Sequence, residues 1–108
     1  MAKYLIQASY TAEGTRGVMK EGGTKRRQTV EAHVKAAGGS VEAFYFAFGD
    51  ADAVVIVDLP DNATAAALSL AVNSSGLVAL KTQVLLTPEE IDQASKKKDV
   101  KYRAPGKR

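Results

Sequence analysis

Residues 53–59, AVVIVDL, are apolar at almost every position, and this run limits the folds open to the chain more than any other feature. A strand that is apolar on both sides belongs inside a sheet whose two faces are both covered. Residues 41–48 form a second aromatic-rich strand pattern, and Gly-Asp-Ala-Asp at 49–52 is typical of the corner between two strands. The sequence therefore predicts a β-hairpin that is covered on both faces.

The other elements follow from periodicity and from end signals. Residues 3–10 alternate as a strand does, and the segment 25–37 has apolar residues at helical spacing. We expect Thr11, Thr24 and either Asp61 or Asn62 to cap helices, and Thr87 to form a capping box with Glu90. The expected strands are 3–10, 41–48, 53–59 and 77–86, and the expected helices are a short piece after Thr11, 25–37, 63–72 and 87–94.

This order, β-α-β-β-α-β with a short final helix, predicts an α+β fold of the ferredoxin-like type. Its four-stranded antiparallel sheet would carry two main helices on one face. The opposite face would then expose a larger apolar patch than monomers usually tolerate. A face-to-face homodimer would cover it, because a closed dimer needs only one self-complementary surface. A higher homo-oligomer could also form through the weakly charged last strand.

Composition narrows the class of protein. A chain of 108 residues that is 45% hydrophobic is expected to form one globular domain. With no cysteine and one histidine, it lacks the residues for the usual zinc sites, and we expect no metal and no cofactor. No stretch has the length of a membrane span, and the first ten residues lack a signal-peptide pattern. We therefore expect a cytoplasmic protein without membrane contact.

The positive charge is concentrated at one end of the chain. Residues 96–108 hold seven basic side chains and one acidic side chain, a charge of +6, whereas residues 1–95 hold eight basic and eleven acidic, a charge of −3. Domains that bind nucleic acid usually spread basic residues over one face. We therefore expect a domain over 1–95 and a flexible basic tail over 96–108, and we favour a solvated tail over contact with nucleic acid.

Five segments carry a resemblance to a known family: KYLIQASYTAEGTRG, KEGGTKRR, GGSVEAFYFAFGDADAVVIVDLPD, AVNSSG and LLTPEE. Over about residues 3–92 the chain resembles the GYD-domain family of small, mostly bacterial proteins of unknown function. The resemblance implies a dimeric α/β-barrel, in which two ferredoxin-like units pack sheet to sheet. Because that larger group includes monooxygenases, isomerases and haem-related enzymes, the resemblance implies no single chemistry.

The family is named for a Gly-Tyr-Asp signature, which corresponds here to FGDAD at residues 48–52. Phe48, Gly49 and Asp52 match the pattern, but Ala51 stands where the family has tyrosine. No phenol is available at that position, so the resemblance carries no tyrosine-dependent activity over to this chain.

Asp52 and His33 are the candidates for catalysis. Turn chemistry alone accounts for Asp52 at a hairpin corner, although a carboxylate in dry, apolar surroundings would also suit a general base. His33 lies one position from the apolar line of its helix. It is either a surface residue at the edge of that line or an imidazole between helix and sheet, where it would transfer protons near neutral pH.

Tyr10, Tyr45, Arg26 and Arg27 are the candidates for ligand binding. The tyrosines are either core or interface rings, or else their hydroxyls converge with His33 at the polar end of an apolar pocket. The arginines either form a solvated face or hold an anion such as a carboxylate near the start of the second helix.

Two functions remain open from the sequence. The aromatic-rich sheet favours a dimer that binds a small aromatic or apolar molecule between helices and sheet, or that acts on it as a metal-free enzyme. The lack of a recognisable nucleophile and base pair favours the alternative, a non-catalytic binding or regulatory module. Such a module would use its dimeric scaffold and basic tail to meet an acidic partner.

Overall fold

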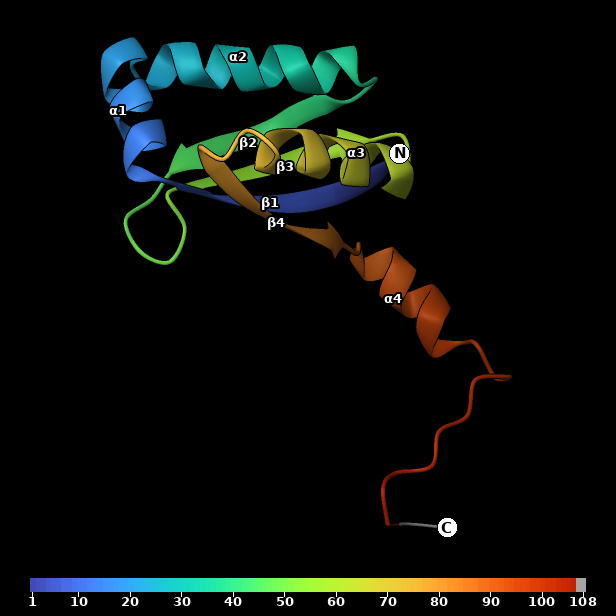
Figure 1. Ribbon diagram of the computed structural model, residues 1–108. Helices are drawn as coiled ribbons and strands as arrows, with labels where there is room; N and C mark the ends of the chain where they lie inside the picture. The colour runs from blue at the N-terminus through green and yellow to red at the C-terminus, as the bar shows by residue number, and fades with distance from the viewer. Residues whose placement is uncertain (107–108) are drawn as a thin grey trace.

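The computed structural model describes residues 1–106 of the chain. The elements in chain order are β1 (Ala2–Tyr10), α1 (Ala12–Glu21), α2 (Gly23–Ala36), β2 (Ser40–Phe46), β3 (Ala53–Leu59), α3 (Asn62–Asn73), β4 (Val78–Leu85) and α4 (Pro88–Ser95). They form an α+β fold around a four-stranded sheet (Figure 1). None of the helices described is long and apolar enough to cross a membrane.

The sheet is antiparallel throughout, with the strand order β2-β3-β1-β4. The apolar strand β3 lies between β2 and β1, so the prediction of an interior strand is confirmed. β1 is the other interior strand and pairs with β3 on one side and with β4 on the other. β2 and β4 are the two edges of the sheet.

The helices α2 and α3 cover the same face of the sheet. The core on that face contains the side chains of Tyr4, Val57 and Leu59, none more than 1% exposed. Val34 of α2 and Ala65 of α3 belong to the same core cluster. In Figure 1, α2 lies along one side of the sheet and α1 crosses one end of it. Burial of large apolar side chains is the main force holding this layer on the sheet.

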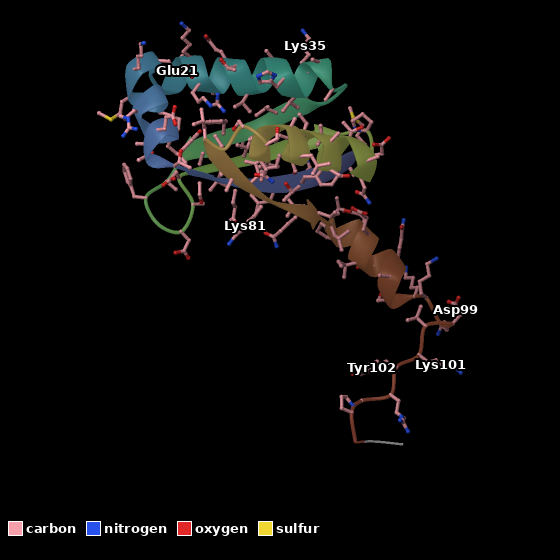
Figure 2. All side chains as sticks on the ribbon, viewed as in Figure 1. Glu21, Lys35, Lys81, Asp99, Lys101 and Tyr102 are labelled. Atoms are coloured by element: carbon pink, nitrogen blue, oxygen red, sulfur yellow. The ribbon has the colours of Figure 1, made fainter. Side chains whose placement is uncertain are left out.

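Within residues 1–106, no helix covers the other face, which we call the open face (Figure 1). Leu5 and Ile56 are paired across β1 and β3 on this face and are half-buried. Tyr45, opposite Val54, is 71% exposed. Lys81 projects from the sheet on the side away from α2 (Figure 2). The open face therefore mixes apolar and polar side chains, and the hairpin is covered on one face only within a single chain.

A cluster of charged side chains lies at one end of the open face. Lys3 Nζ lies 2.5 Å from Glu42 Oε1 and 3.1 Å from Asp58 Oδ1. The hydrogen bond to Glu42, followed by that to Asp58, raises the pKa of Lys3 above its ordinary value of 10.5. The ion pairs fix the relative positions of β1, β2 and β3 at this end.

Three of the predicted helix caps are confirmed and one is wrong. Thr11 and Asp61 accept backbone hydrogen bonds at the starts of α1 and α3, and Thr87 forms the capping box with Glu90. Thr24 does not cap α2, because that helix already begins at Gly23 and has no side-chain cap. Gly22 separates α1 from α2 with a φ of 87°, a conformation that glycine adopts without steric cost.

The predicted alternation along β2 is wrong at its start because the strand contains a bulge. The pairing with β3 shifts between Val41 and Ala43, so one extra residue is inserted there. Val41 and Phe44 both pack against the core on the helix-covered face, although simple alternation would place them on opposite faces. The strand also ends at Phe46, and Phe48 is fully exposed in the corner.

The last part of the chain stands apart from the rest. No residue of α4 is buried, and residues 86–103 are all exposed. The segment 96–106 contains no helix or strand, and Lys107 and Arg108 of the expected tail lie outside the described residues. We call residues 86–106 the C-terminal arm. It runs away from the sheet on the side opposite α2 (Figure 1), and Tyr102 lies far from the body of the molecule (Figure 2).

Candidate ligand-binding site

The space between the helices and the sheet is not filled at the end where β1 runs into α1. A cavity of about 430 Å³ lies between α1, α2, α3 and the start of β4, and a smaller hollow of about 80 Å³ lies against the sheet. We call the two together the interlayer pocket. The residues that line both parts are Tyr10, Arg26, His33, Leu68, Val72 and Val78. The shared lining shows that the two hollows are neighbouring parts of one site.

Two glycines of α1 shape the pocket in different ways. A Cβ atom at Gly14 would collide with the backbone carbonyl oxygen of Leu77, so glycine allows α1 to lie close to the turn before β4. A Cβ atom at Gly17 would meet nothing within 4 Å. Gly17 lines the cavity three residues after Gly14, on the same side of the helix. The cavity is therefore open partly because residue 17 has no side chain.

Most of the remaining wall is apolar. Val18 of α1, Leu68 and Val72 of α3, and Val78 of β4 all border the cavity. The inner hollow is bordered by Ile6, Ala8 and Val55 of the two interior strands, together with Phe44 and further apolar residues. Such walls suit an apolar or aromatic molecule, since its burial removes apolar surface from water.

Arg26 is the charged residue that lines both parts of the pocket. It lies near the start of α2, and the residue is half-buried. Its Nε atom is buried and has no hydrogen-bond partner within residues 1–106. Over the same residues, the ion pairs are those of Lys3 at the opposite end of the sheet. Arg26 therefore brings to a largely apolar site a guanidinium whose Nε has no partner among the described residues.

Asp52 and Tyr10 are connected at the mouth of the pocket. The Asp52 carboxylate accepts a hydrogen bond from the backbone N–H of Tyr10 at 2.8 Å. The backbone N–H of Asp52 donates to the carbonyl of Ala8, also at 2.8 Å. The corner that carries the altered family signature thus fixes the end of β1, from which Tyr10 borders the pocket. Asp52 itself is half-buried and is not part of the pocket wall.

The structure brings together three of the six predicted site residues. Tyr10, Arg26 and His33 line the pocket, and His33 lies on an exposed position of α2. Tyr45 lies on the open face, so its hydroxyl does not converge with His33. Arg27 is exposed and does not line the pocket.

Sequence reasoning missed Glu13 and Glu21, two exposed acidic residues of α1 at the edge of the larger cavity. Figure 2 places Glu21 near the corner where α1 meets α2. Sequence reasoning also gave no role at the pocket to Gly14 and Gly17, which both border it. Their spacing of three residues is a signal that could have identified the inward side of α1.

The arrangement can hold an amphiphilic small molecule. The walls accept its apolar part, while a guanidinium, an imidazole and a phenol are available for its polar part. Such groups interact more strongly in a site of low dielectric than in water. Within residues 1–106, no three His, Cys, Asp or Glu side chains are grouped in a way that could hold a metal ion.

Comparison with known proteins gives one match. The model of a family described as the GYD domain matches residues 4–95, which covers the elements from β1 to α4 except for the first two residues of β1. No curated protein matches the chain. No solved structure matches it.

Proposed function

The chain belongs to the GYD domain family, and from this and the interlayer pocket we propose that it binds a small, largely apolar or aromatic molecule between its helices and its sheet. The pocket is the observation that carries the proposal. Its volume of about 430 Å³ falls within the range of roughly 300–1,000 Å³ that is usual for ligand sites. Mostly apolar walls with a few polar groups are also the usual composition of such sites.

The experiment uses Gly17, because a side chain there enters open space. Gly17→Phe should fill much of the cavity without disturbing the core, and Gly17→Ala is the matched control that leaves it open. We expect the wild-type protein and Gly17→Ala to bind the neutral apolar dye Nile red, with an increase in its fluorescence. Gly17→Phe should weaken that binding by at least about tenfold, which corresponds to the loss of roughly one buried aliphatic group.

Thermal unfolding of all three proteins shows whether the fold is intact. Equal dye binding by Gly17→Phe, at a melting temperature no lower than that of the wild type, would contradict the proposal. So would the absence of dye binding by the wild-type protein.

The proposal includes a sheet-to-sheet homodimer of ferredoxin-like units. The strand order β2-β3-β1-β4 supports that arrangement, and the open face supplies Leu5, Val54 and Ile56 as the apolar centre of an interface. Val54→Lys should convert the dimer to a monomer in light scattering after size exclusion. Thr82→Lys, on the exposed edge strand, is the control and should leave the dimer intact. A wild-type protein that is monomeric at micromolar concentration would contradict this part.

A second candidate is a non-catalytic module that meets an acidic partner through the C-terminal arm. The observation in its favour is that the arm runs away from the sheet (Figure 1) and that its basic side chains are all exposed: Lys96, Lys97, Lys98, Lys101 and Arg103. Binding to an acidic polymer such as heparin should then weaken steeply with salt and disappear after deletion of residues 96–108. Binding that survives the deletion would contradict this candidate.

A further inference from the structure

The pocket contains one polar atom whose bonding is incomplete, the Nε of Arg26. Within residues 1–106, this Nε is the buried side-chain polar atom for which no hydrogen-bond partner is found. Buried polar groups in folded proteins are nearly always hydrogen-bonded, so an exception needs an explanation. A buried N–H donor without a partner destabilises a protein, and the destabilisation is removed when an acceptor binds to it.

We propose that the ligand of the interlayer pocket carries a carboxylate and that Arg26 binds it. The inference rests on the proposed small-molecule function and specifies the class of ligand. A guanidinium presents its N–H groups in a planar fork that matches the two oxygens of a carboxylate. Arg26 lines both the larger cavity and the inner hollow, so a carboxylate bound there has the apolar walls directly beside it. Leu68 and Val72 would contact the apolar part of the same molecule.

Neighbouring charges favour a carboxylate over a phosphate ester. Glu13 and Glu21 border the larger cavity but not the inner hollow, and neither forms an ion pair with Arg26. They therefore leave the guanidinium available. Their own charges also repel a second negative charge at the mouth of the pocket. A ligand with a single negative charge, held at the inner end near Arg26, experiences less of this repulsion than a dianion.

The other two predicted residues in the pocket support an acidic head group as well. Tyr10 and His33 line both hollows together with Arg26, so the pocket has three lining residues that are able to donate hydrogen bonds. A carboxylate accepts several hydrogen bonds at once through its two oxygens. The exposed Arg27 has no part in this site and serves as a control.

The test compares acids with their neutral esters by isothermal titration calorimetry. The probes are 2-naphthoate and octanoate, each paired with its methyl ester. Wild-type protein should bind each acid about ten- to a hundredfold more tightly than its ester, which is the effect expected of a charge-assisted hydrogen bond. Arg26→Gln should remove this preference while leaving ester affinity within about twofold. Arg26→Lys should retain part of the preference, because it keeps the charge but loses the fork.

Arg27→Gln is the matched control and should behave as the wild type in the same titrations. Equal affinity for acids and esters in the wild-type protein would overturn the carboxylate proposal and leave the pocket proposal standing. Retention of the preference in Arg26→Gln would overturn it too. If neither acids nor esters bind, and Gly17→Phe behaves as the wild type with Nile red, the small-molecule function itself is wrong.

Discussion

The two ends of the space between helices and sheet differ in how they are filled. At the end where β1 begins, which we call the filled end, Tyr4 and Leu59 are almost completely buried. There Gly39 approaches β3 so closely that a Cβ atom would collide with the carbonyl oxygen of Asp58. At the end where β1 runs into α1, the hollow end, a Cβ atom at Gly17 would meet nothing and a cavity of about 430 Å³ remains.

This difference shows how a small chain separates stability from binding. The filled end contains Tyr4 and Leu59, two of the largest fully buried side chains, so it contributes much of the hydrophobic stabilisation. The hollow end contributes fewer contacts and keeps its polar side chains available. Changes at the two ends should therefore have different consequences, and four such changes follow in order of decreasing effect.

Leu59→Ala should cause the largest loss of stability. Leu59 has 0% exposure at the filled end, and its truncation would leave a cavity in packed surroundings. We expect the free energy of unfolding to fall by about 3 kcal/mol. The matched change at the hollow end is Leu68→Ala, for which we expect about half that loss because Leu68 already borders open space. Urea denaturation followed by circular dichroism measures both, and equal losses would contradict the distinction between the two ends.

The two glycines of α1 should respond in opposite directions to the same substitution. Gly14→Ala should lower the free energy of unfolding by about 2 kcal/mol, because its methyl group collides with the backbone at Leu77. Gly17→Ala should raise it by up to about 1 kcal/mol, since alanine favours the helix and meets no neighbour. Urea denaturation of the two variants measures both changes in the free energy of unfolding. A loss of stability in Gly17→Ala would show that the hollow end is packed more tightly than described.

Tyr4→Phe should have a smaller effect at the filled end. The buried Tyr4 hydroxyl donates a hydrogen bond to Asn62 Oδ1 at 2.5 Å, which connects β1 to the start of α3. Its removal should lower the free energy of unfolding by about 1 kcal/mol. Tyr10→Phe is the control at the hollow end, where we expect a change of less than about 0.5 kcal/mol. A larger loss of unfolding free energy for Tyr10→Phe than for Tyr4→Phe would contradict this expectation.

The smallest effect concerns pH and the start of α3. Asp61 accepts hydrogen bonds from the backbone N–H and the hydroxyl of Thr64, and these bonds lower the pKa of Asp61 below its ordinary value of 3.8. A carboxyl with a lowered pKa stabilises the folded state above its ordinary pKa, and this contribution is lost as pH falls through the folded-state pKa.

The melting temperature of Asp61→Ala should therefore be lower than that of the wild type at neutral pH, with the difference shrinking below pH 3.8. Thermal scans between neutral and acidic pH measure it. Melting temperatures of the two proteins that differ by the same amount at every pH would contradict the role of the charged cap.

Local signals in the sequence predicted much of the fold. Thr11, Asp61 and Thr87 mark helix starts because a cap depends only on residues within the next turn. The prediction that Thr24 caps α2 was wrong, because the helix begins earlier, after Gly22. The backbone conformation of Gly22 starts the helix without a side-chain cap. The bulge in β2 could not be predicted from alternation, because it depends on the pairing with β3.

The candidate site was less accessible to sequence reasoning, because residues far apart in the chain form it. Arg26 was one of several basic residues around α1 and α2, and only packing distinguishes it from the exposed Arg27. The sequence left open whether Tyr45 is a core or interface ring or converges with His33, and the pairing of β2 with β3 places it on the open face. The cavity at Gly17 is a property of how α1 lies over the sheet, which no local pattern encodes.

The absence of buried residues in α4 has a consequence for handling the molecule. Its eight residues are held by the Thr87 cap and by their own backbone hydrogen bonds, and isolated helices of that length are marginal in water. In a single chain we expect this helix to melt and re-form without disturbing the sheet. We therefore expect its amide protons to exchange quickly with solvent, and a protease that cuts between residues 86 and 103 to release a shortened body that keeps its core and its melting behaviour.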